Sequence, residues 1–213
     1  MKVFDLRYPG TWLNGMSDAG LRTQVDTLFH VLTSHLADAA VGLAMFEEAV
    51  PTLRAAQPAQ GNAPRSYLHR LPFIHAHTVL YALDAIDKML GVLARTSGLP
   101  AGITAAQAAL RTALPHLTAI RDSAHHLEDR SRGLDRRSAP LPLQPISNQM
   151  INAPAGGVLA LANLNGAKLG YTIADGRYAE IEISAVSVAS AQASIQQAID
   201  AFSWRGHSRT EPS

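Results

Sequence analysis

Between residues 21 and 46, apolar side chains recur at every third or fourth position, which is the spacing of one face of an α-helix. The stripe consists of Leu21, Val25, Leu28, Leu32, Leu36, Ala39, Leu43 and Phe46. Ser17 or Asp18 can cap the start of this helix, and Pro51 is expected to close it after about Val50. A long helix with one apolar stripe is stable only when other apolar surfaces cover that stripe. The chain is therefore constrained to pack helices side by side.

Three further helices are predicted from the same kind of pattern, over Ser66–Thr96, Thr104–Leu114 and Pro115–Arg132. Pro115 separates the last two, because proline lacks an amide hydrogen and clashes with the preceding helical turn. The modest loops between these helices favour an up-and-down helical bundle over residues 17–135, after an irregular lead-in at 1–16.

The C-terminal part of the chain has a different pattern. Residues 136–157 are rich in proline and glycine and are predicted to form a connector. Within 158–204, strand-like runs are separated by Asn165-Gly166 and Asp175-Gly176, dipeptides that tolerate the positive φ of tight turns. They predict a three-stranded antiparallel meander followed by a final helix, and a disordered tail at 205–213. The expected fold class is mainly α: a helical bundle with a small C-terminal meander and a final helix.

The composition excludes several kinds of site. No cysteine is present, so disulfides, thiolate metal sites and thiol nucleophiles are all excluded. The formal net charge of +1 provides no overall field that would attract nucleic acid, so any RNA binding would have to be local. The N-terminus lacks the apolar core of a signal peptide, and no run approaches the roughly 18 apolar residues of a membrane span. We therefore expect a cytoplasmic protein with no membrane partner.

The stretch IRDSAHHLEDR, residues 120–130, concentrates groups that can transfer protons. On a continuous helix, Asp122 lies one turn before His126, and His125 lies one turn before Asp129. Each imidazole would then have a carboxylate within reach, which can fix its tautomer and raise its pKa.

Arg121 adds a permanent positive charge one turn before His125. An arginine can stabilise negative charge on a phosphate, and a histidine can move protons near neutral pH. Metal-independent RNA cleavage, in which the ribose 2′-hydroxyl attacks the adjacent phosphate, needs both properties. The same spacing also describes an ordinary solvated helix face, and spacing alone favours this purely structural interpretation.

No other motif predicts a metal or cofactor site. His75 and His77 would point about 200° apart on a helix, so they could not easily share one ion. The stretch LNGAKLG lacks the spacing of a phosphate-binding loop, and no Glu-x-x-His pair of the kind found in bundle metal centres is present. We therefore predict no metal and no cofactor.

The residues from Arg121 to His126, RDSAHH, resemble the motif of the HEPN superfamily: an arginine, a polar residue, three variable residues and a histidine. The stretch FIHAHTVLYALDAIDKML is similar to the long apolar helix before the motif helix in several bacterial HEPN-like proteins. The resemblance covers residues 17–135 and does not extend to the meander.

The resemblance implies a homodimer in which two motif helices meet and form one cleft that works without metal. Arg121 would hold the scissile phosphate, His126 would act as acid or base, and Asp122 would support His126. Helical geometry places His125 rather than His126 over Arg121, so either Arg121 and His126 work together across the dimer or the two histidines exchange roles.

The functional hypothesis is thus a metal-independent endoribonuclease of the toxin or defence type, with RNA as substrate and an antitoxin or other protein as a further partner. Four arginines after the motif would form either a track for the RNA backbone or an ordinary solvated connector: Arg130, Arg132, Arg136 and Arg137. The alternative is a non-catalytic helical binding module that uses the same polar helix face for a protein or nucleotide partner.

Overall fold

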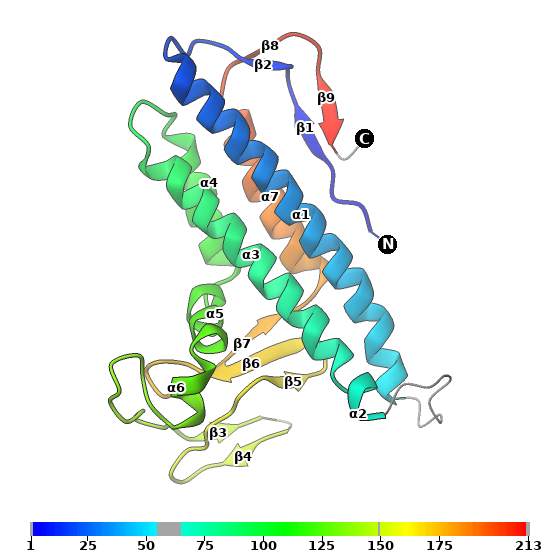
Figure 1. Ribbon diagram of the computed structural model, residues 1–213, viewed down its shortest axis with the longest axis vertical. Helices are drawn as coiled ribbons and strands as arrows, with labels where there is room; N and C mark the ends of the chain where they lie inside the picture. The colour runs from blue at the N-terminus through cyan, green and yellow to red at the C-terminus, as the bar shows by residue number, and fades with distance from the viewer. Residues whose placement is uncertain (1, 55–64, 149, 212–213) are drawn as a thin grey trace. The chain divides into compact units, whose positions relative to one another are not determined.

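The computed structural model describes residues 2–54, 65–148 and 150–211, and it divides into two compact units (Figure 1). The first unit contains Met1–Ala113 together with Ala185–Ser213, and the second contains Leu114–Ser184. This differs from the predicted division, which placed a bundle at 17–135 and a separate meander with a helix at 158–204. The helix after the meander returns to the first unit.

The first unit is helical, with α1 (Ala19–Arg54), the short α2 (Arg65–Leu68), α3 (Leu71–Arg95), α4 (Gly102–Ala113) and α7 (Ala185–Asp200). The predicted stripe of α1 is confirmed, because every member from Val25 to Phe46 except Leu28 is buried. α1 and α3 run antiparallel and side by side (Figure 1). A Cβ at Gly42 of α1 would lie 3.0 Å from the Thr78 side chain of α3, so the glycine permits a close approach.

Three helical predictions need correction. The predicted Ser66–Thr96 helix is divided into α2 and α3, and α3 has its N-terminal cap at Arg70. α1 continues past Pro51 to Arg54. A proline near the C-terminal end of a long helix removes only one backbone hydrogen bond, so the helix need not end there. The last helix of the first unit is α7, in place of the predicted Pro115–Arg132. α7 packs against α1, α3 and α4, and its buried residues include Val188, Ala191, Ile195, Ala198 and Ile199.

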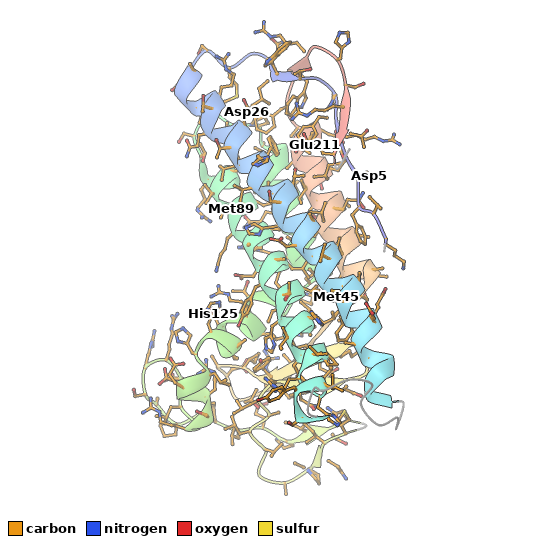
Figure 2. All side chains as sticks on the ribbon, turned by 45° about the vertical axis from the view of Figure 1, so that its right-hand side comes forward. Asp5, Asp26, Met45, Met89, His125 and Glu211 are labelled. Atoms are coloured by element: carbon orange, nitrogen blue, oxygen red, sulfur yellow. The ribbon has the colours of Figure 1, made fainter. Side chains whose placement is uncertain are left out.

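Both ends of the chain form strands, which overturns the predicted irregular lead-in and disordered tail for the described residues. β1 (Leu6–Tyr8) pairs antiparallel with β9 (Arg209–Glu211), and β2 (Trp12–Leu13) pairs with β8 (Trp204–Arg205). Figure 2 labels Asp5 and Glu211 beside this pairing. Met1, Pro212 and Ser213 lie outside the described residues.

Apolar side chains and one glutamine hold these strands in place. Tyr8 is buried, and its ring packs edge-on against Phe29 of α1 and against Trp204. Gln196 of α7 accepts a hydrogen bond from the Arg7 amide and donates one to the Arg7 carbonyl, each at 2.8 Å. The Gln196 side chain thus makes the two hydrogen bonds to Arg7 that the backbone of a neighbouring strand would otherwise make.

The second unit contains α5 (Leu117–His125), α6 (Leu127–Ser131) and two sheets. β3 (Ile146–Ser147) and β4 (Asn152–Ala153) form a hairpin inside the predicted connector, of which Gln149 lies outside the described residues. β5 (Asn163–Asn165), β6 (Lys168–Thr172) and β7 (Tyr178–Glu182) form the predicted antiparallel meander. Gly166 and Gly176 have positive φ values of 62° and 81° in its two turns, as the turn dipeptides predict.

The meander has one apolar and one polar face. Directly paired residues share a face, so Leu169 with Ile181 and Tyr171 with Ala179 form the apolar side, and all four are buried. The opposite face carries the polar residues Asn163, Asn165, Lys168, Thr172, Tyr178, Glu180 and Glu182. α5 packs against β6 and β7 within this unit.

Within the described residues, Ala19–Val50 of α1 is long and apolar enough to cross a membrane by length and composition alone. This differs from the expectation that no run approaches a membrane span. Core helices of soluble proteins pass the same test, and the buried stripe of α1 accounts for its apolar composition.

Replacing Trp204 by alanine is expected to lower the free energy of unfolding by about 3 kcal/mol, because the ring packs against Tyr8 and Phe29. Trp12→Ala is the matched control: Trp12 is 59% exposed, so the change should stay below about 0.5 kcal/mol. Urea unfolding followed by circular dichroism measures both variants. A loss for Trp204→Ala as small as that expected for Trp12→Ala would mean that the packing of the Trp204 ring contributes little to stability.

Candidate functional site

The predicted motif helix is interrupted at His126. α5 ends at His125, and His126 has φ −101° and ψ 43°, which are not helical values. Its amide still donates to the Asp122 carbonyl at 3.0 Å, and α6 begins at Leu127. A single helical wheel across residues 115–132 is therefore wrong, because residues on either side of His126 belong to different helices.

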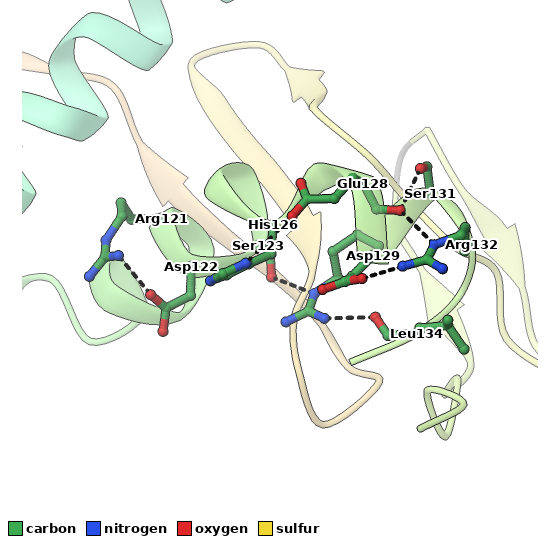
Figure 3. A network of polar contacts seen from close by, with 10 residues as sticks. Arg121, Asp122, Ser123, His126, Glu128, Asp129, Ser131, Arg132 and Leu134 are labelled. Carbon is green, nitrogen blue, oxygen red and sulfur yellow. Dashed lines mark hydrogen bonds and ion pairs between the residues drawn. The ribbon is translucent and has the colours of Figure 1, made fainter. Parts of the chain in front are cut away.

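The interruption replaces the predicted carboxylate–imidazole pairs with other contacts (Figure 3). Asp122 pairs with Arg121, at 2.8 Å between Oδ1 and Nη1, instead of with His126. The His126 Nδ1 lies 3.8 Å from Glu128 Oε1, and Asp129 pairs with Arg132.

The exposure of the motif residues differs sharply. The Arg121 side chain is only 16% exposed, whereas that of His126 is 41% exposed. His125 is exposed at the end of α5 (Figure 2). The histidines are thus accessible to a ligand, and the guanidinium group of Arg121 is mostly covered.

Arg130 cannot belong to the predicted arginine track, because it is only 1% exposed. Its Nη1 donates to the Leu134 carbonyl at 2.8 Å, and its Nε donates to Ser123 Oγ at 3.4 Å. The turn from α5 into α6 directs this side chain inward, so it ties α6 to α5 and cannot contact RNA. The other three arginines of the track, Arg132, Arg136 and Arg137, are exposed.

A cleft of about 600 Å³ lies elsewhere in the second unit, beside β7. One wall is the segment of residues 144–148, which includes β3. The other wall is formed by residues of β6, by β7 and by Arg177 before it. The Gln144 amide donates to the Gly176 carbonyl at 3.1 Å, so the first wall is attached to the turn between β6 and β7.

Polar side chains beside the cleft form a connected network across the meander. Asn163 of β5 donates to the Tyr178 hydroxyl at 3.1 Å, and that hydroxyl donates to Glu180 Oε1 at 3.1 Å. Lys168 Nζ lies 3.7 Å from Glu180 Oε2. A Cβ at Gly170 would collide with the Tyr178 hydroxyl, so the glycine leaves space for this ring on the sheet.

The Tyr178 hydroxyl is protonated near neutral pH. Burial raises the pKa of the Tyr178 phenol to about 12, an effect that the nearby Glu180 carboxylate reinforces and the hydrogen bond from Asn163 opposes. The hydroxyl therefore acts as a fixed hydrogen-bond donor to Glu180 near neutral pH, and it does not act as a base.

β7 is an edge strand, and its register decides which backbone groups face the cleft. Ile173 N–H donates to the Arg177 carbonyl and Ile183 N–H donates to the Ala167 carbonyl, so hydrogen-bonded pairs recur at every second residue. Ala179 and Ile181 consequently direct their amide and carbonyl groups toward β6. Tyr178 and Glu180, which line the cleft, direct theirs away from β6.

The sequence reasoning missed this cleft for two reasons. Lys168, Tyr178 and Glu180 form no recognisable motif, although the alternation in YAEIE indicates a strand with one polar face. The opposite wall lies in residues 136–157, which were predicted to be only a connector.

One group of potential metal ligands is also found in the described residues, away from the cleft lining. It consists of His126, Glu128 and Asp129.

Comparisons with known proteins do not identify the chain. No protein-family model matches the sequence, and comparisons with curated proteins and with solved structures give no significant match. The resemblance to the HEPN superfamily therefore depends on the two sequence stretches alone and stays a prediction.

Arg130→Met should lower the free energy of unfolding by about 2 kcal/mol, because the Leu134 carbonyl loses its charged donor inside the protein. Arg136→Met is the control, since Arg136 is exposed and its loss should have an effect below about 0.5 kcal/mol. Chemical denaturation of both variants gives the comparison. An unchanged stability of Arg130→Met would contradict the structural role assigned to this side chain.

Proposed function

We propose that this chain is a protein-binding module, in which the cleft of the second unit receives an extended segment of a partner as an added strand beside β7. The observation that carries the proposal is the outward direction of the Tyr178 and Glu180 backbone groups at an edge strand that lines a cleft. An edge of this kind pairs readily with another strand, and main-chain hydrogen bonds then supply much of the affinity.

The wall formed by residues 144–148 supports the same mode of binding. In the hairpin of β3 and β4, the Asn148 amide donates to the Ile151 carbonyl at 2.8 Å. The alternation of antiparallel pairs then directs the backbone of Ser147 away from β4. Ser147 also lines the cleft, so an inserted strand meets strand-like backbone on both sides.

Side chains on the polar face would select the sequence of the partner. Alternate residues of an added strand point to the same face as Glu180 and Glu182, which are two residues apart on β7. Opposite charges on neighbouring strands contribute roughly 0.2–1 kcal/mol per pair. We therefore expect preferred partners to carry lysine or arginine at alternate positions.

The proposal is tested by selecting extended peptides from a random phage-displayed library on the immobilised full chain. Glu180→Pro should weaken binding of a selected peptide by about 10-fold or more, because it removes an outward amide without removing a hydrogen bond to β6. Glu180→Ala is the matched control: it keeps the amide and should lose less affinity. Equal affinity of the wild type and the correctly folded proline variant would refute strand addition at β7.

The ribonuclease hypothesis is the second candidate, and the exposed imidazole of His126 favours it. His126 is 41% exposed beside Glu128, and Arg121 lies five residues earlier on α5. In this proposal a homodimer brings Arg121 and His126 to one RNA phosphate, with Arg132, Arg136 and Arg137 along the RNA backbone. Asp122 would then orient Arg121, its partner at 2.8 Å, instead of supporting His126.

Chelator-treated protein incubated with single-stranded RNA tests this candidate. His126→Ala should reduce cleavage by about 100-fold or more if the imidazole transfers protons, and His125→Ala should have a much smaller effect. Cleavage at the same rate by the wild type and both variants would indicate a contaminating nuclease and defeat the hypothesis.

A further inference from the structure

We infer that His126, Glu128 and Asp129 form a binding site for a divalent transition-metal ion such as Zn²⁺. Each of the three residues offers one ligand atom, and these atoms lie within 4.8 Å of one another. The site is separate from the cleft beside β7, and it differs from the prediction that the chain holds no metal.

The interruption between α5 and α6 creates this grouping. In a continuous helix, residues two positions apart point to different sides, so His126 and Glu128 would not face each other. The non-helical backbone of His126 places its Nδ1 3.8 Å from Glu128 Oε1. Asp129 follows in the same first turn of α6, and its carboxylate completes the set (Figure 3).

The neighbouring arginine orients one of the ligands. Arg132 Nη2 contacts Asp129 Oδ1 at 2.5 Å, and Arg132 Nε donates to the Glu128 carbonyl at 3.3 Å. A carboxylate held through one oxygen can still coordinate an ion through the other, and such partners commonly fix the orientation of ligands in metal sites. The Asp129 side chain is 17% exposed, so it is the most constrained of the three.

The ligand set favours a transition metal over calcium or magnesium. Imidazole with carboxylates suits Zn²⁺, whereas calcium and magnesium prefer sites built only from oxygen. At Zn–ligand distances of about 2.1 Å, tetrahedral ligands lie about 3.4 Å apart, so the three groups must close by little more than 1 Å. The His126 and Glu128 side chains are 41% and 69% exposed and have space for this adjustment. Three protein ligands leave a fourth position for water or a substrate.

The acidic residues also have a purely local explanation, because carboxylates in the first turn of a helix are stabilising there. That explanation gives no role to His126 and predicts no saturable metal binding. The two explanations therefore differ in a measurable way.

Isothermal titration of the metal-free full chain with Zn²⁺, and visible absorption with Co²⁺ as the spectroscopic probe, test the inference. We expect one ion per chain, with affinity reduced about 10-fold or more in both His126→Ala and Asp129→Asn. His125→Ala is the matched control and should retain the wild-type affinity, because His125 is outside the cluster. Absence of saturable binding, or equal binding by the wild type and His126→Ala, would overturn the inference.

Discussion

Two tight turns, at Gly166 and Gly176, set the register of β5, β6 and β7, and the geometry of the cleft beside β7 depends on that register. Both glycines have positive φ, which residues with a Cβ rarely adopt. A slip of one residue would exchange the faces of the sheet, exposing Leu169 and burying polar groups such as Glu180. It would also reverse the direction of the backbone groups that now face the cleft. The proposed strand addition at β7 therefore requires the observed register.

Local periodicity predicted the parts of the fold that depend on neighbouring residues. The stripe of α1 and the turns of the meander follow from spacing and turn chemistry within short segments. The partner of each element was not predictable in this way. α7, which follows the meander, packs in the first unit, and β1 pairs with a strand about 200 residues later in the chain. The alternation of Phe4, Leu6 and Tyr8, all buried, was the signal for a strand before the Pro9-Gly10 turn.

The candidate site was predicted less well than the fold, because its geometry depends on one break in a helix. A continuous helix would have paired Asp122 with His126, whereas the break leaves Asp122 with Arg121 and brings His126 toward Glu128. The burial of Arg130 is equally invisible in the sequence, since buried and exposed arginines have the same local pattern. The cleft beside β7 could not be predicted, because one of its walls depends on the path of residues 144–148. No periodic pattern in the sequence indicates that path.

Residue-resolved amide hydrogen exchange tests strand addition at β7 most directly. In the free chain, the amides of Tyr178 and Glu180 should exchange rapidly, while those of Ala179 and Ile181 should be protected by their bonds to β6. Saturation with a selected peptide should slow exchange of the first two amides by about 100-fold and change the second two much less. Tyr178 and Glu180 amides that are already protected in the free chain, or that stay unprotected in the complex, would contradict the proposed binding mode.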